Sequence, residues 1–254
     1  NPHARVRRRP RLTMASEPPL ALVTGASRGI GAALAAALAA SGHHLLLTGR
    51  DETALVATED RIHAAGGTAT IAPLDLSRHD DIDRLADAVA GRWGRLDLLV
   101  LDAAQLGTLT PLAYADPAEF ANVLSVNLVA QWRLVRAFDP LLRRARGTVV
   151  ALTSAQGSAP RAYWGAYAIS KAGLEAMAAI YAAEMEALGV RVLLVNPGAT
   201  RTAMRARAFP GEDPLTVKDP ETVAAAVVDA LSGLGPGLTR LTLDRGGSVM
   251  RSAA

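Results

Sequence analysis

One predicted helix carries a tyrosine and a lysine at a spacing suited to moving a proton. Tyr167 and Lys171 are four residues apart, so they share one face of the helix predicted over Tyr163–Leu188. A tyrosine titrates near ~10, which is too high for efficient proton transfer at neutral pH. A cation about 4 Å from the phenol, at an effective dielectric constant of ~20, contributes roughly 4 kcal/mol, or about three pKa units. We therefore predict that Lys171 lowers the pKa of Tyr167.

The scarcity of lysine and the position of a nearby serine both support this interpretation. The sequence contains only two lysines, Lys171 and Lys218, although arginine is abundant. Tyr163 is the rival phenol, but its i+4 residue is Tyr167, so it lacks the cation. Ser154 follows a predicted strand, where its hydroxyl could hydrogen-bond a substrate oxygen beside Tyr167. No histidine lies near it in the pattern, which argues against a Ser-His-Asp hydrolase.

A glycine-rich turn is the second feature with chemical meaning. Residues 24–31 read TGASRGIG and join a predicted strand to an Ala-rich predicted helix. Glycines let the backbone turn tightly and approach a pyrophosphate, while the helix N-terminus offers free N–H groups and the positive end of its dipole. The G-x-x-x-G-x-G spacing differs from the commoner G-x-G-x-x-G fingerprint. Three glycines alone would also fit a tight strand–helix turn, but this position favours a dinucleotide site.

The elements that must position these groups follow from the apolar pattern. Several short runs are apolar without alternation, as expected for strands covered on both faces, and helical stretches separate them. We predict an α/β fold: a single doubly wound Rossmann-type domain over residues 18–254 with a seven-stranded parallel sheet. The predicted strands are Leu20–Thr24, His44–Thr48, Thr68–Leu74, Asp97–Leu101, Gly147–Thr153, Val190–Asn196 and Thr239–Leu243. The predicted helices are Ile30–Ala40, Glu52–Ala65, Asp80–Arg92, Pro117–Arg144, Tyr163–Leu188 and Pro220–Leu231. Residues 202–218 are predicted to be a loop that acts as a lid or is disordered.

These motifs resemble those of the short-chain dehydrogenase/reductase family. Residues 24–31 are similar to its TGxxxGxG element, Tyr167 and Lys171 to its YxxxK pair, and residues 197–202 to its PGxxxT element. The resemblance spans roughly residues 18–246, and residues 161–214 resemble one bacterial branch with poorly defined substrates. It implies an oxidoreductase that transfers a hydride between NADP(H) and a small-molecule carbonyl or alcohol, with Tyr167 as general acid/base.

The resemblance also implies specific site residues. The catalytic set would be Asn127, Ser154, Tyr167 and Lys171, with Asn127 supporting Lys171 through water. Asp75 would face the adenine, and the PGxxxT element would contact the nicotinamide end. The expected cofactor-binding residues are Gly25, Ser27, Arg28, Gly29, Ile30, Gly31, Arg50, Asp75, Leu76, Ala103, Tyr167, Lys171, Pro197, Gly198 and Thr202.

The end of the second predicted strand bears on the choice of cofactor. NAD-preferring enzymes place a carboxylate there, but here Gly49 is followed by Arg50, and Arg28 stands in the glycine loop. Two guanidiniums without an acid suit a 2′-phosphate, so NADP is predicted. NAD is the alternative, because a boundary shifted by one residue would place Asp51 at this position. Alternatively, Arg28 and Arg50 could be solvent-exposed side chains that take no part in cofactor binding.

One stretch departs from the family pattern. The family carries Asn-Asn-Ala-Gly after the fourth strand, and this chain has Leu-Asp-Ala-Ala at residues 101–104. Ala104 adds a methyl and restricts φ, and Asp102 loses an amide donor. The departure motivates a second hypothesis, a nicotinamide-nucleotide-binding sensor or scaffold with little turnover. The intact Ser154, Tyr167 and Lys171 count against it.

The amino-acid composition excludes or disfavours several other kinds of protein. The sequence has no cysteine, which excludes disulfides and thiolate chemistry, and its five histidines lack zinc-binding spacing, so no metal is predicted. The pI of about 9.7 comes largely from five arginines in residues 1–13, because subtracting five from the net charge of +3 leaves −2 for the rest. Nucleic-acid binding is therefore disfavoured. Residues 1–17 are expected to be a flexible basic arm, either native or added by cloning, with Met14 as a candidate start.

The expected setting is that of a small cytoplasmic enzyme. The longest apolar run, Ile30–Ala40, is too short to span a bilayer, and no signal peptide is evident. We expect no membrane and no nucleic-acid partner. The expected assembly is a homodimer or homotetramer.

Overall fold

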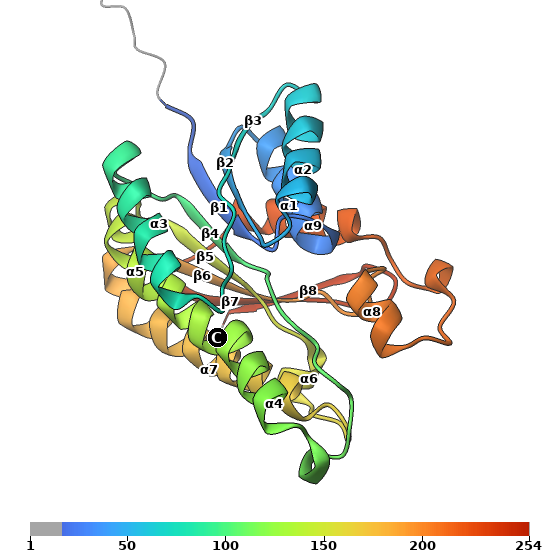
Figure 1. Cartoon of the computed structure of the whole chain (residues 1–254). Helices are drawn as coiled ribbons and strands as arrows, with labels where there is room; N and C mark the ends of the chain where they lie inside the picture. The colour runs from blue at the N-terminus through green and yellow to red at the C-terminus, as the bar shows by residue number, and fades with distance from the viewer. Residues whose placement is uncertain (1–16, 254) are drawn as a thin grey trace, which may run out of the picture.

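An eight-stranded sheet runs through the middle of the molecule in the computed structural model, which describes residues 17–253 (Figure 1). The predictions for residues 1–16 lie outside this range. The strand order is β3-β2-β1-β4-β5-β6-β7-β8, and all neighbours are parallel except β7 and β8. The strands are β1 Leu20–Thr24, β2 His44–Thr48, β3 Thr68–Ile71, β4 Leu98–Leu101, β5 Thr148–Leu152, β6 Arg191–Asn196, β7 Gly237–Leu243 and β8 Val249–Ala253.

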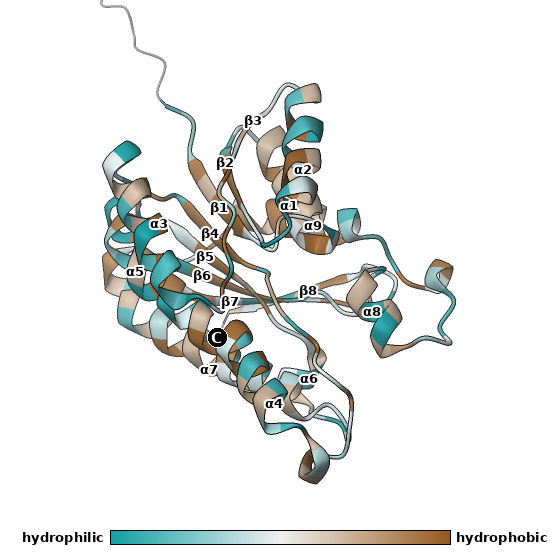
Figure 2. Cartoon of the chain, viewed as in Figure 1, coloured by the Kyte–Doolittle hydropathy of each residue, from teal (hydrophilic) through white to brown (hydrophobic). Residues whose placement is uncertain are grey.

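Helices cover both faces of the sheet and enclose two apolar cores. Alternate residues of the central strands face opposite sides, and both sets are apolar, so Leu99 enters one core and Val100 the other. The first core includes residues of α3, α5 and α7, and the second includes residues of α1, α2 and α9. Figure 2 shows the strands as largely hydrophobic and the outer helix faces as mixed with hydrophilic residues. The main helices are α1 Gly29–Ala40, α2 Glu52–Ala64, α3 His79–Arg92, α4 Pro117–Leu124, α5 Ala130–Ala145, α6 Ala155–Ser158, α7 Gly165–Met185, α8 Ala203–Ala208 and α9 Pro220–Leu231.

The prediction of seven parallel strands was wrong by one strand. β8 pairs antiparallel with β7, and all of its residues are exposed. A strand at the edge of a sheet buries little surface, so its sequence lacks the apolar run by which the inner strands were predicted. β3 is also shorter than predicted, because it ends at Ile71 rather than Leu74.

Two predicted helical or loop segments differ in the structure. The single helix expected over Pro117–Arg144 contains a π-turn at Ser125–Val129, between α4 and α5. Residues 202–218 are not a plain loop: they contain α8 and a 3-10 turn at Pro214–Thr216. Thr202 caps α8 by accepting a hydrogen bond from the Arg205 backbone N–H at 3.1 Å. Such a local cap can start a short helix without an extended apolar pattern.

Candidate active site

A cleft of about 810 Å³ lies where the strands β1, β2, β4, β5 and β6 end at their carboxyl edge. This edge includes the junction of β1 and β4, where the strand order reverses and open α/β folds bind ligands. Most residues predicted from the sequence line the cleft: Gly25, Ser27, Arg28, Gly29, Ile30, Arg50, Asp75, Leu76, Ala103, Tyr167, Lys171, Pro197 and Thr202. Four other predicted residues are not part of this lining: Gly31, Asn127, Ser154 and Gly198.

The helix α7 brings the predicted tyrosine and lysine into the cleft together. The side chains of Tyr167 and Lys171 are both buried, with residue exposures of 8% and 3%. Lys171 Nζ donates a hydrogen bond to the Leu152 carbonyl oxygen at 2.7 Å and lies 5.8 Å from the centroid of the Tyr167 ring. Ser154, the N-cap residue of α6, lies near the phenol and lowers its pKa. The three polar groups predicted to act together therefore meet at the end of β5.

The prediction that Lys171 lowers the pKa of Tyr167 is wrong for this structure. Burial raises the pKa of Tyr167 to about 12; the nearby Ser154 hydroxyl lowers the value and the Asp102 carboxylate raises it further. Burial also lowers the pKa of Lys171 to about 8, against the attraction of Asp102 and Glu175. The spacing of the two residues does not account for the desolvation of both groups or for the carboxyl group of Asp102, which follows β4.

Asn127 lies in the π-turn and is almost fully buried. Its Nδ2 donates to the Gln105 carbonyl oxygen at 2.8 Å and to Ser170 Oγ at 3.0 Å, and its Oδ1 accepts from the Gln105 backbone N–H at 2.7 Å. The side chain thus ties the loop after β4 to α7, the helix that carries Lys171. Its expected link to Lys171 through water stays a prediction.

The glycine loop has the backbone that its sequence requires. Gly25 and Gly29 have φ of +71° and +59°, in the region that glycine favours. A Cβ on Gly25 would lie 3.0 Å from the Ala103 Cα, and one on Gly31 would collide with the Gly25 carbonyl oxygen. Gly31 therefore allows the loop to pack on the start of α1.

The arginines expected to favour NADP line one end of the cleft. Arg28 and Arg50 are both exposed there, and Arg61 joins them. Asp51 is the N-cap of α2, where its carboxylate accepts a hydrogen bond from the Ala54 backbone N–H at 3.1 Å. Asp51 is absent from the cleft lining. Asp75 accepts hydrogen bonds from Ser77, which lower its pKa.

The loop that departs from the family pattern is firmly held. Thr24 Oγ1 donates to the Val100 carbonyl oxygen at 3.0 Å and accepts from the backbone N–H of Asp102 at 3.0 Å and of Ala103 at 3.2 Å. The φ of Ala104 is not positive, so alanine is accommodated there without the strain anticipated from the sequence. The backbone has a conformation that does not need glycine.

A series of contacts links α8 and the residues around it to Tyr167. Arg205 pairs with Glu212 through two hydrogen bonds of 2.6 and 2.7 Å, and Arg245 binds the same carboxylate at 2.9 Å. The Arg205 guanidinium stacks 3.6 Å from the Phe209 ring centroid, and Trp164 lies between Phe209 and Tyr167, with centroids 5.8 Å from each. This chain of contacts forms an aromatic wall beside the phenol.

Lys218 secures the base of the same segment. It is buried, and its Nζ donates to the Ala199 carbonyl oxygen at 3.0 Å and to the carbonyl oxygen of Asp244. Gly198, with φ of +62°, packs against the end of β7, where a Cβ would meet the Leu243 carbonyl oxygen. Gly198 thus shapes the segment that places Pro197 and Thr202 at the cleft.

Sequence analysis missed several residues that take part in this site. Gln131 donates to the Ala103 carbonyl oxygen at 3.1 Å, and Thr153 Oγ1 donates to Glu175 Oε1 at 2.7 Å, one turn beyond Lys171. Polar residues within otherwise buried segments are a signal that could have identified them. Arg201 and Arg207 also line the cleft near α8, and they have no sequence signal beyond their place in the predicted loop.

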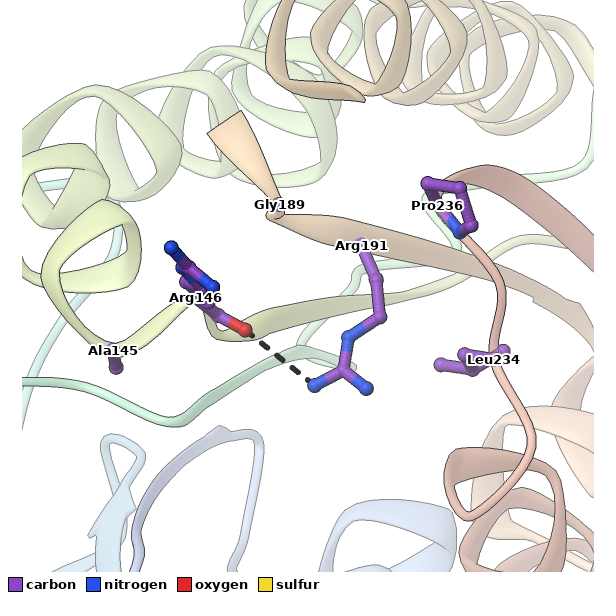
Figure 3. Close-up of a pocket in the computed structure, with 6 residues that line it drawn as sticks. All are labelled: Ala145, Arg146, Gly189, Arg191, Leu234 and Pro236. Atoms are coloured by element: carbon purple, nitrogen blue, oxygen red, sulfur yellow. Dashed lines mark hydrogen bonds between the residues drawn. The ribbon is translucent and has the colours of Figure 1, made fainter. Parts of the chain in front are cut away.

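A second hollow, of about 490 Å³, lies at the opposite, amino edge of the sheet. Figure 3 shows Arg191 pointing towards Arg146, with its Nη2 3.5 Å from the Arg146 carbonyl oxygen. None of the predicted site residues lines it. Elsewhere within residues 17–253, no three histidine, aspartate or glutamate side chains gather in a metal-ligating cluster. None of the helices in that range is both long and apolar enough to cross a membrane.

Comparison with known proteins places this geometry in a family. The family profile described as short chain dehydrogenase matches residues 19–213. The chain belongs to this family. Its relatives include the oxidoreductase YciK of Escherichia coli K12, described as uncharacterised, which is 38% identical over 206 residues covering 80% of this chain and 81% of YciK.

Two solved structures of short-chain dehydrogenases share the fold closely. One, from Shigella flexneri and complexed with NADP, has a TM-score of 0.83 and 35% identity, covering 90% of this chain and 97% of its own. The other, from Escherichia coli CFT073 and complexed with NADPH, has a TM-score of 0.83 and 36% identity, covering 89% of this chain and 96% of its own.

Proposed function

We propose that this short-chain dehydrogenase is an NADP(H)-dependent oxidoreductase that interconverts a carbonyl and an alcohol, with Tyr167 as general acid/base. The observation that carries the proposal is the meeting of Tyr167, Lys171 and Ser154 in the cleft that begins at the glycine loop. Relatives solved with NADP and NADPH support the cofactor. The exposed Arg28 and Arg50 support the preference for a 2′-phosphate, with NAD as the alternative.

The residues present fit a dinucleotide. The glycine loop lines the cleft and leads into the N-terminus of α1, whose first backbone N–H groups have no partner within the helix. A volume of about 810 Å³ falls in the range of small-molecule and cofactor sites. Pro197 and Thr202 line the end nearer Tyr167. The nicotinamide supplies hydride chemistry when bound.

The chain's own residues would handle the proton and the substrate oxygen. Tyr167, neutral at pH 7 because burial raises its pKa to about 12, would donate its hydroxyl proton to the carbonyl oxygen during reduction. Ser154 would hydrogen-bond the same oxygen and stabilise charge that develops there. Lys171, fixed on the Leu152 carbonyl, would hold the nicotinamide ribose. The wall of Trp164 and Phe209 would exclude water from this end.

The test replaces the phenol and leaves its neighbours in place. Tyr167→Phe should abolish turnover, with a loss of 10²-fold or more on the scale of general acid–base catalysis (~10²–10⁴), while NADPH affinity stays nearly unchanged. Tyr163→Phe, which removes an exposed hydroxyl on the same segment, is the matched control and should keep full activity. A substrate is first chosen by screening aldehydes, ketones and alcohols with both nicotinamides. Near-normal kcat in Tyr167→Phe would contradict the assignment.

We also propose that the chain assembles as a homodimer or homotetramer. Large apolar side chains are exposed on α5 and α7, among them Trp132, Ile169 and Ile180. Exposed apolar groups of this kind suit burial against a second copy. Light scattering after gel filtration should give a mass of at least two chains, and a monomer at micromolar concentration would contradict the proposal.

A further inference from the structure

Asp102, the acid that stands where the family carries asparagine, is directed at the glycine loop. Its carboxyl group lies close to the backbone of Gly31 and Gly25. A Cβ placed on Gly25 would lie 3.1 Å from Asp102 Oδ2, and one on Gly31 only 2.7 Å. The Asp102 backbone is fixed by Thr24 Oγ1 at 3.0 Å, which limits movement away from the loop. A negative group is therefore held against the turn that must contact the pyrophosphate.

The charges that face Asp102 come from α7. Lys171 attracts it, the Tyr167 phenol is destabilised as an anion by it, and Glu175 lies one turn beyond Lys171. Burial raises the pKa of Asp102 to about 7, while Lys171 and the Gly31 N–H lower it. The other charged residues that line the same cleft are Arg28, Arg50, Arg61, Asp75, Glu119, Arg201, Arg207 and Glu221. The surroundings of Asp102 thus favour its protonated form more than water does.

We propose that Asp102 takes up one proton from solvent when the dinucleotide binds, so that cofactor affinity depends on pH through the glycine loop. The inference rests on the proposed function. A pyrophosphate adds negative charge beside Gly25, which disfavours a second anion at Asp102. Protonation converts the carboxylate to a neutral acid and removes the repulsion. An asparagine would occupy the same place without a charge and without binding a proton.

Calorimetry measures this coupling directly. NADPH binding at pH 7.5–8 in two buffers of different ionisation enthalpy should show uptake of up to one proton by the unmodified protein. Its Kd should rise by up to tenfold per pH unit above pH 7. The Asp102→Asn variant should take up markedly fewer protons on binding, and it should bind NADPH more tightly than the unmodified protein at pH 8.5. Titration of the NADPH 2′-phosphate contributes equally to both proteins. The difference in proton uptake between them therefore reports Asp102 and the change that its loss causes at Lys171.

A matched acid in the same cleft serves as control. Asp75→Asn removes a carboxylate that accepts hydrogen bonds from Ser77, and it should keep the pH slope of Kd whatever its effect on affinity. Equal proton uptake and equal slopes in Asp102→Asn and the unmodified protein would overturn the coupling alone. Absence of NADPH binding at every pH in the unmodified protein would instead overturn the proposed function, and the coupling with it.

A second measurement needs no cofactor. The pKa of Asp102 lies above its unfolded value of 3.8, so the folded chain binds more protons between pH 4 and pH 7. The contribution of Asp102 to stability is therefore complete below about pH 4 and is lost as pH rises to about 7. The Tm advantage of Asp102→Asn over the unmodified protein should grow across this range. A constant difference in Tm would contradict the raised pKa of Asp102.

Discussion

The protonation of the Tyr167 hydroxyl sets the pH dependence expected at the scale of single residues. With its pKa raised to about 12 by burial, the phenol is neutral throughout the neutral range. Carbonyl reduction, which needs the protonated form, should be nearly independent of Tyr167 ionisation below pH 9. Alcohol oxidation needs the deprotonated form and should accelerate as pH rises, by up to tenfold per unit. Initial rates in both directions from pH 6 to 10 test this, and an oxidation optimum below pH 7 would contradict it.

The two cleft arginines give a second prediction at this scale. Arg28→Ala combined with Arg50→Ala should weaken NADPH binding by about 1–3 kcal/mol, roughly 5- to 150-fold in Kd, and leave NADH binding largely unchanged. Arg84→Ala, which removes an exposed guanidinium of α3, is the control and should change neither affinity. Calorimetric titration gives the dissociation constants of NADPH and NADH for the unmodified protein and for the doubly substituted variant. Equal affinities for NADPH and NADH in the unmodified protein would rule out the preference for NADP.

The identities of the site residues were easier to predict from the sequence than their pKa values. The i, i+4 spacing of Tyr167 and Lys171 placed both on one helical face, and the structure brings them to the cleft with Ser154. Their pKa values could not be predicted from spacing, because they depend on burial and on Asp102, a group more than sixty residues away in the sequence. Proximity of that kind is produced only by the folded sheet.

At the scale of elements, the segment over residues 202–218 carries the next prediction. Its Glu212 carboxylate joins Arg205 to Arg245, and these guanidiniums lower the pKa of Glu212 to about 2, so the pairing persists at neutral pH. Glu212→Gln should increase backbone hydrogen exchange of the segment in the free protein by roughly two- to fivefold. Glu184→Gln, at an exposed position on α7, is the control.

Exchange also tests whether this segment is a lid. Saturating NADPH should slow exchange over residues 202–218, because closure over the nicotinamide end would protect Met204 and the backbone around it. The slowing should be smaller in Glu212→Gln. Identical exchange with and without NADPH would show that the segment is a fixed wall, and would direct the search for substrate-specificity residues to Trp164.

Elements were predictable where burial leaves a pattern in the sequence. The inner strands are apolar on both faces and were placed within a few residues of their ends. β8 buries none of its residues, and α8 depends on a Thr202 cap and on contacts with Glu212, so neither has a strong periodic signal. The π-turn at Ser125–Val129 was also missed, because one additional residue in a helical turn hardly alters the apolar spacing.

At the scale of the whole molecule, the sheet order places the chemistry. The chain returns from β3 at one edge to β4 beside β1, so the loops after β1 and β4 lie together at the cleft. Thr24 ties these two loops by hydrogen bonds to Asp102 and Ala103. The class of fold followed from alternating strands and helices, but this contact follows from topology, and no local sequence pattern reveals it.

The burial of both lysines makes the molecule unusually simple to probe with proteases. Lys171 and Lys218 are the only lysines in the sequence, and each ε-amine is engaged with backbone carbonyl oxygens. A protease that cleaves only after lysine therefore finds no exposed target side chain on the native surface. Cleavage after Lys218 reports opening at the base of α9, and cleavage after Lys171 reports opening of α7. One digestion time course thus compares the local stability of the end of the segment over residues 202–218 with that of α7.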